Sequence, residues 1–358
     1  MPYNRSMFRL TGFTTLLAGG LFFGPPAPSY AINIAVDYQY DTNHFFDSQE
    51  KTEALEAAAR RFSQIITTSL NRVELVDDAT DARIGFQHPA NGNTWDVSPA
   101  VHSGSDALPA AGGSLAQEYR GPWSIPQDTW ILYAGGRPFS VAGQGGTGTG
   151  VNFGRVFSDG NSILNRGFRA SGTNTNLPVW GGVITFDSDN STNWHFDIES
   201  APPAGTTDLY SVALHEIGHA LGLNTRWQEW SQWTSGGAFT GPHALAAYNA
   251  DNTTNLTSLS EVNSINSHWH DGSYDSKIFT SAGPNLIGSV GEGNLQDLLM
   301  EPIAHFTPTI TRFELTNVDV AALRDVGWAV VPEPSSLALV FGACSGLLVC
   351  FACSRQPR

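Results

Sequence analysis

The segment from Thr206 to Leu223 constrains this chain more than any other, because it combines a helix with a metal-binding pattern. It opens with Thr206-Thr207-Asp208, which provides a capping hydroxyl and an acid in the first helical turn. His215 and His219 stand at i and i+4, so both imidazoles leave one face of the helix at the spacing that a tetrahedral zinc ion needs. Glu216 follows the first histidine and can reach a metal-bound water as a general base without being a ligand.

This His-Glu-x-x-His pattern is specific. At the histidine and glutamate content of this chain, only about 0.01 chance occurrences are expected. Gly222 lies where the longer form of the motif requires glycine, and it would end the helix in a left-handed conformation that turns the chain back toward the metal. The alternative is a helix whose histidines are ordinary polar residues, and the low chance expectation argues against it.

The motif resembles that of the metzincin zinc peptidases, with one departure. Their third histidine follows three residues after the glycine, where this chain has Thr225, a poor zinc ligand. A later segment, Ser267-His268-Trp269-His270, supplies two further histidines. After it comes Leu298-Leu299-Met300-Glu301-Pro302, which looks like the metzincin Met-turn, a methionine under the zinc site. This order of helix, long insertion, histidine and methionine resembles the leishmanolysin-like branch.

The resemblance implies a complete zinc site and a reaction. His215, His219 and His268 would be the zinc ligands, and His270 is the fallback for the third position. Glu216 would activate a zinc-bound water for attack on a peptide carbonyl. We therefore expect a zinc-dependent endopeptidase that acts on peptide or protein substrates.

Two other interpretations stay open on the sequence. In a gluzincin-type peptidase, a downstream glutamate such as Glu229 or Glu261 would be the third ligand, but Gly222 and Met300 then have no role. A cell-surface or matrix adhesion protein with a degenerate zinc site would explain the missing third histidine. The intact Glu216 argues against it, because a non-catalytic zinc site does not need that residue.

Apolar periodicity predicts an α+β domain over residues 32–331, which the resemblance makes a metzincin-like zincin domain: a twisted mixed sheet, an active-site helix and a C-terminal helix. The C-terminal helix is capped at Thr316-Asn317-Val318-Asp319 and ended by Gly327, and a long insertion covers residues 224–266. An earlier helix from Gln49 to Leu70 has an apolar stripe of Leu55, Ala59, Phe62 and Ile66. Strands are predicted at Ile32–Tyr40, Arg83–Phe86, Trp130–Ala134 and Gly181–Asp187.

Two segments before the motif carry further expectations. The glycine-rich run Gly143–Gly150 is followed by no helix pattern and has no lysine, so we predict a flexible surface loop rather than a phosphate loop. Gly182–Asp189 resembles the matrixin strand that precedes the active-site helix, and Val183–Phe186 would be an edge strand that pairs with the substrate backbone. Asp187 and Asp189 predict a calcium site after this strand, and a solvated acidic turn is the alternative left open.

Both ends of the chain indicate targeting segments rather than parts of the fold. Residues 1–31 combine Arg5 and Arg9 with an apolar stretch, which is typical of a signal peptide. Residues 332–358 contain Pro332-Glu333-Pro334, an apolar run and terminal arginines, and they resemble a PEP-CTERM sorting signal. The resemblance implies processing by an exosortase-like enzyme. We expect an exported protein at the cell surface or in the extracellular matrix, with a transient or a permanent C-terminal membrane anchor.

Composition limits which other classes of protein the chain could belong to. All three cysteines lie in the C-terminal segment, at Cys344, Cys350 and Cys353, so the central region must be held by its own core without disulfides. Only 14% of the residues are charged, and the net charge is −15. The two ends carry four of the 18 basic residues and one of the 33 acidic ones, which leaves −18 on residues 32–331. This balance excludes a nucleic-acid partner, and the 41% hydrophobic content excludes a disordered acidic chain.

Overall fold

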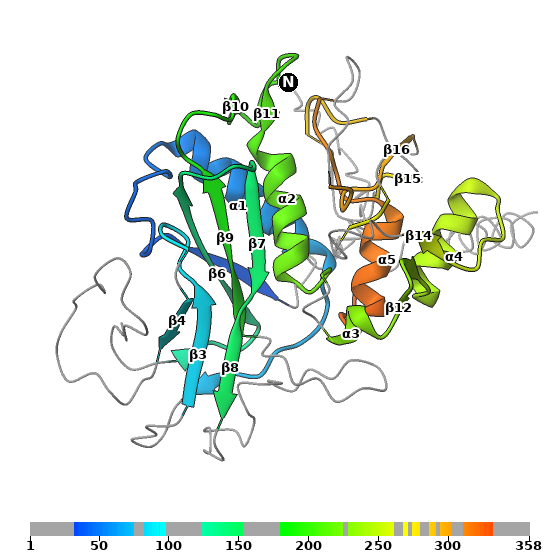
Figure 1. The fold of residues 1–358 in the computed structure, drawn as a ribbon, viewed down its shortest axis with the longest axis horizontal. Helices are drawn as coiled ribbons and strands as arrows, with labels where there is room; N and C mark the ends of the chain where they lie inside the picture. The colour runs from blue at the N-terminus through cyan, green and yellow to red at the C-terminus, as the bar shows by residue number, and fades with distance from the viewer. Residues whose placement is uncertain are drawn as a thin grey trace, which may run out of the picture.

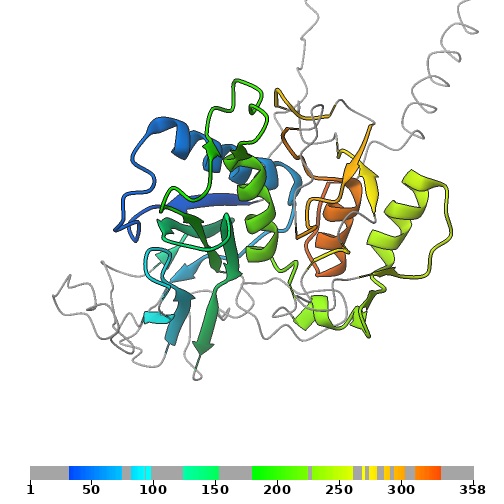
Figure 2. The same cartoon turned by 45° about the horizontal axis from the view of Figure 1, so that its top comes forward.

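Helix α2 (Leu209–Ala220) separates the main sheet from the C-terminal part of the molecule, where helices α5 (Asn317–Asp325) and α4 (Pro242–Asn252) lie (Figures 1 and 2). The structure is a computed structural model. It describes residues 32–74, 82–92, 94–97, 124–152, 180–224, 228–260, 268–270, 274–279, 286–290, 294–302 and 311–331. The proposed signal peptide, the C-terminal sorting segment and Thr225 lie outside these residues. Within the described ranges, no helix has both the length and the apolar character that a membrane crossing requires.

The main sheet has four strands in the order β1-β6-β9-β7. The strands β1 (Asn33–Asp37), β6 (Thr129–Arg137) and β9 (Gly181–Asp187) run parallel, and β7 (Gly143–Thr147) is antiparallel at the edge. The predicted strands at β1, β6 and β9 are therefore confirmed. The mixed sheet and the accompanying helices also confirm the α+β class.

The position of β7 corrects two predictions. Gly143–Gly150 is not a loop, because β7 and β8 (Thr149–Asn152) occupy it. Val183–Phe186 is not an edge strand, because β9 pairs with β6 on one side and with β7 on the other. Glycine disfavours strands, but it also permits close backbone approach, and a Cβ on Gly145 would collide with the backbone of Glu216. Pairing with β9 makes the first part of this run a strand, and its glycines allow it to pack closely against α2.

Smaller sheets surround the main one. The strands β3 (Ala82–Gln87) and β4 (Thr94–Val97) form an antiparallel sheet with β8, which confirms the strand predicted at Arg83–Phe86. The remaining short strands are β2 (Val73–Glu74), β5 (Ser124–Ile125), β10 (Trp194–His195), β11 (Thr207–Asp208), β12 (Thr234–Ser235), β13 (Ala238–Phe239), β14 (Leu259–Ser260), β15 (Asp275–Lys277) and β16 (Leu295–Asp297).

Helix α1 (Gln49–Ile65) carries three members of the predicted apolar stripe, and Ile66 directly follows its end; all four residues are buried. The helix ends earlier than the predicted Leu70. Ile66 is already extended and forms an antiparallel bridge with Val330, so the chain leaves the helix to join the C-terminal segment.

The N-terminus of α2 is fixed by a buried ion pair. The predicted threonine cap is wrong: Asp208 itself caps the helix, because its carboxylate accepts a hydrogen bond from the Ser211 backbone N–H. Arg312 donates to both carboxylate oxygens of Asp208, at 2.9 and 3.1 Å, and both side chains are almost fully buried. At the other end Gly222 has φ 108°, in the left-handed region that the motif predicts. The active-site helix is therefore held at both ends.

Helix α5 begins with a capping box between Thr316 and Asp319, as predicted. Gly327 follows its end with φ 106°. At its last residue, Asp325 accepts hydrogen bonds from the backbone N–H groups of His243 and Ala244, at 3.0 and 2.9 Å, which are the first turn of α4. The insertion therefore docks onto the C-terminal helix. It contains α3 (Gln228–Ser231), β12, β13, α4 and β14.

Candidate active site

Three imidazoles converge beside α2. The Nε2 atoms of His215 and His219 lie 3.1 Å apart, and the Nε2 atom of His268 lies 3.2 Å from the first and 3.0 Å from the second. Within the described ranges, this is the one group of three or more metal-binding side chains. The structure thus brings together the three histidines predicted from the sequence. His270 is exposed and does not belong to the group.

The outer ring nitrogens show which tautomers the helix histidines adopt. The Nδ1–H of His215 donates to the Leu299 carbonyl at 2.7 Å, and the Nδ1–H of His219 donates to the Leu223 carbonyl at 2.8 Å. A carbonyl oxygen can only accept, so each Nε2 carries a lone pair. These lone pairs point at one another and at His268 Nε2. When all three imidazoles are neutral, only His268 can carry a proton on Nε2, so at most one of the three Nε2 atoms is a hydrogen-bond donor. A cation in the middle satisfies all three nitrogens, so the donor set fits zinc, whose usual ligands include neutral imidazole.

Burial keeps these histidines neutral. It lowers the pKa of His215 to about 4 and that of His268 to about 3, and it lowers the pKa of His219 well below the usual value. The proximity of the other imidazoles lowers the pKa of His219 and His268 further. At neutral pH the triad is therefore uncharged, the state in which imidazole binds a metal.

Glu216 is buried, and β7 holds its carboxylate. The backbone N–H of Gly145 donates to Glu216 Oε2 at 2.5 Å. Burial raises the pKa of Glu216 to about 8, and the hydrogen bond from Gly145 opposes this shift. A cation at the triad would act in the same direction as the hydrogen bond, because a nearby positive charge favours the ionised carboxylate. The contact with Gly145 was missed from the sequence, because the glycine-rich run was assigned to a loop.

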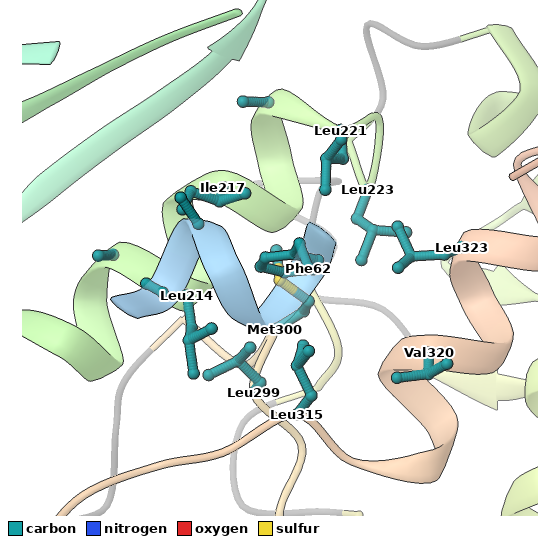
Figure 3. Packing of buried hydrophobic residues seen from close by; sticks show 14 of the residues in the cluster. Phe62, Leu214, Ile217, Leu221, Leu223, Leu299, Met300, Leu315, Val320 and Leu323 are labelled. Carbon is teal, nitrogen blue, oxygen red and sulfur yellow. The ribbon is translucent and has the colours of Figure 1, made fainter. Parts of the chain in front are cut away.

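Met300 lies where a Met-turn would place it. A Cβ on Gly218 would clash with the Met300 sulfur, so the methionine packs directly against α2 between the two histidine positions. Figure 3 shows Met300 next to Phe62, within the apolar cluster of helices α1, α2 and α5. The preceding residue, Leu299, provides the carbonyl that accepts from His215. The turn therefore orients one imidazole and supports the helix.

One carboxylate ties the turn to the third histidine. Asp319 of α5 accepts from the backbone N–H of Leu299 at 3.0 Å and of Met300 at 3.4 Å, and also from the indole N–H of Trp269 at 3.2 Å. It closes the capping box with Thr316 as well. The sequence indicated the cap, but nothing in it showed that the same side chain reaches the two loops beside the triad.

Asp187 forms a hydrogen-bonded turn. Its carboxylate accepts from the backbone N–H groups of Phe139, Asp189 and Thr192 and from the hydroxyls of Ser191 and Thr192. Burial alone would raise the pKa of Asp187, but these hydrogen bonds outweigh it and lower the pKa to about 2. Protein donors thus occupy the carboxylate. The calcium site at Asp187 and Asp189 stays a prediction.

Three features define the class of metzincin-type zinc peptidases. They are a mixed sheet beside a histidine-bearing helix, a glycine that turns the chain back after this helix, and a methionine packed against the helix. The sequence model of the matrixin family matches residues 31–229, more than half of the chain, and the chain belongs to that family. Membership supports a zinc-dependent endopeptidase in general. The match includes His215, Glu216 and His219 but ends before His268 and Met300, so only their positions in the structure connect these two residues with the site. No curated protein matches the chain.

The gluzincin-type alternative loses its basis. The family match is to matrixins, and the structure brings His268 together with the two helix histidines. Glu261 lies outside the described residues, as does the side chain of Glu229.

Proposed function

We propose that this chain is an endopeptidase in which His215, His219 and His268 bind zinc and Glu216 is the general base. The observation that carries the proposal is the convergence of three Nε2 atoms within 3.2 Å of one another, two of them with lone pairs fixed by outer hydrogen bonds. Zinc, when bound, would supply a Lewis acid that acidifies water and polarises the peptide carbonyl.

The protein's own groups would do the rest. Glu216 follows the first histidine on α2 and would take a proton from the attacking water, then pass it to the leaving amine. The hydrogen bond from the Gly145 N–H would keep one carboxylate oxygen in place, so the other is left to handle the proton. A fixed base is more effective because little reorientation is needed when the proton moves.

The substrate backbone would pair with β7 rather than with β9. The sheet order puts β7 at the edge, and among the described residues no strand pairs with its outer side. An extended peptide could add to that edge through backbone hydrogen bonds. Because β7 also contacts Glu216, this pairing would bring a peptide bond close to the general base.

We also propose that the protein is exported by the signal peptide at residues 1–31. The segment at 332–358 would be a PEP-CTERM signal for an exosortase-like enzyme and would anchor the protein at the cell surface or in the matrix. The motifs in the sequence support these assignments. The leishmanolysin-like arrangement is supported by the insertion between Gly222 and His268, which contains α3, α4 and three short strands.

The test uses the full chain and three variants. Zinc content is measured by mass spectrometry and cleavage is measured on casein. We expect one zinc and cleavage in the unaltered chain, zinc without cleavage in Glu216→Ala, and loss of both in His268→Ala. His270→Ala is the matched control, because it removes a histidine two residues away that does not face the triad. Equal cleavage by Glu216→Ala would refute its role, and loss of zinc in His270→Ala but not in His268→Ala would refute the choice of ligand.

A further inference from the structure

We infer that residues 228–260 of the insertion between α2 and the third histidine hold the third metal ligand in place, and that Trp269 is the positioning residue through which they act. The inference rests on the proposed zinc site. It concerns how His268 is oriented, and it gives the insertion a role in the site although the insertion takes no part in the reaction itself.

His268 is held differently from the other two ligands. His215 and His219 lie on a helix, and each is fixed by a hydrogen bond from Nδ1 to a carbonyl. His268 lies in no helix or strand, and its buried Nδ1 has no hydrogen-bond partner among the residues that the structure describes. Its orientation must therefore come from the neighbouring residue, Trp269, and from the backbone on either side.

Trp269 is fully buried against two aromatic rings of the insertion. Its ring centroid lies 5.1 Å from that of Trp230, which is in α3, and 5.0 Å from that of Phe239, which is in β13. Trp230 and Phe239 also contact each other, at 4.5 Å. Such aromatic contacts are specific in geometry, so the three rings fix where the backbone at 268–269 runs.

Backbone hydrogen bonds hold the same segment between the insertion and the Met-turn. The N–H of Trp269 donates to the Met300 carbonyl at 3.0 Å, and the N–H of His270 donates to the Ser260 carbonyl of β14 at 3.0 Å. β14 in turn pairs with β13, which carries Phe239. The third-ligand segment is thus hydrogen-bonded to the insertion through Ser260 and to the Met-turn through Met300.

The insertion is itself fixed to α5. Asp325 caps α4, and the Trp233 indole N–H donates to the Asp325 carbonyl at 2.9 Å. The same helix provides Asp319, which accepts from the Trp269 indole. Trp269 is therefore held on one side by α5 and on the other side by the insertion, which α5 also anchors. Zinc binding and the packing of the insertion should then be linked, and the linkage must be reciprocal.

The test measures zinc affinity by competition with a chelator and records the visible spectrum of the cobalt-substituted protein, using the full chain. Phe239→Leu shrinks a ring against Trp269, and Trp269→Phe keeps an aromatic ring but removes the donor to Asp319. We expect each to weaken zinc binding about tenfold or more, the usual effect of losing outer support of a ligand. The matched control is Phe186→Leu, an equally buried ring in β9. It should lower stability without changing zinc affinity.

Hydrogen exchange on the unaltered chain tests the reciprocal effect and does not depend on how the variants fold. Zinc should slow exchange of amides in residues 228–260 more than exchange in β1 and β6. Unchanged zinc affinity in both Trp269→Phe and Phe239→Leu, equal weakening in Phe186→Leu, or no selective slowing would each overturn the inference. These measurements read binding, so a chain that binds zinc but cleaves nothing would defeat the proposed function alone. A chain that binds no zinc would defeat both.

Discussion

Under the proposed function, alanine at Gly145 should slow peptide cleavage strongly, whereas alanine at the next residue should not. A Cβ on Gly145 would overlap the backbone of Glu216, and no side-chain rotation can relieve a clash with a carbonyl. To restore a normal contact of about 3.5 Å, β7 must move away from α2 by more than about 1 Å. The 2.5 Å hydrogen bond from Gly145 to Glu216 would then stretch past the usual limit of about 3.2 Å.

The expected magnitude follows from these two effects. Overpacking costs about 1–3 kcal/mol of stability, and a misplacement of about 1 Å in a catalytic group can cost about a hundredfold in rate. We therefore expect kcat/KM of Gly145→Ala to fall by about a hundredfold, mainly through kcat. At Gly146 an added Cβ would meet only a Val183 methyl at 3.8 Å, so Gly146→Ala should be close to the unaltered chain. Gly143→Ala should fall between them, because its neighbours are side-chain atoms of Val212 and Glu216 that can adjust.

The assay is cleavage of a quenched fluorogenic peptide by the full chain, with zinc content measured in parallel. Both Gly145 and Gly146 have negative φ, so backbone strain does not distinguish them and the comparison isolates the contact with Glu216. If Gly145→Ala cleaves as fast as Gly146→Ala at equal zinc content, then β7 does not position the general base.

Three further predictions concern the surrounding structure. Asp187 has a pKa of about 2 in the folded protein against 3.8 normally, so it stabilises the fold by about 2 kcal/mol above pH 4 and loses this as the pH falls toward 2. In urea unfolding, the difference between the unaltered chain and Asp187→Asn should shrink between pH 6 and pH 2.5, and a constant difference would contradict the assignment. Arg312→Met leaves the buried Asp208 carboxylate unpaired and should cost about 3–5 kcal/mol, against almost nothing for Arg324→Met on an exposed face. Asp319→Asn replaces one acceptor oxygen by a donor that faces N–H groups, so zinc affinity measured by chelator competition should fall about tenfold; unchanged affinity would show that Asp319 does not support the site.

The sequence predicted the helices of the site well because their signals are local. The segment Thr206–Asp208 and the Thr316–Asp319 capping box mark helix starts, although Asp208 rather than a threonine hydroxyl caps α2. Gly222 ends α2 in the conformation that only glycine adopts easily. These signals depend on residues within one or two turns. They therefore do not depend on contacts with distant parts of the chain.

The features that the sequence did not predict depend on contacts between distant segments. The run Gly143–Thr147 has only one residue that favours a strand, Thr147, and it is a strand because it pairs with β9. Glycine is needed at Gly145 because α2 comes so close. Asp319 was identified as a cap, but its contacts with Leu299, Met300 and Trp269 come from loops far away in the chain. His268 was predicted through the order of motifs in a family, since no spacing rule connects it to the helix histidines.

The late position of α5 in the chain affects when a working site can form. Synthesis delivers the two helix histidines first, then the insertion and His268, and only afterwards Asp319 and Asp325. Before α5 is made, the Trp269 indole and the Met-turn amides lack their acceptor, and α4 lacks the carboxylate that caps it. An unfinished chain therefore holds its third histidine loosely. Under the proposed function, hydrolytic activity would appear only after α5 has been made, which would protect growing copies from cutting themselves or one another.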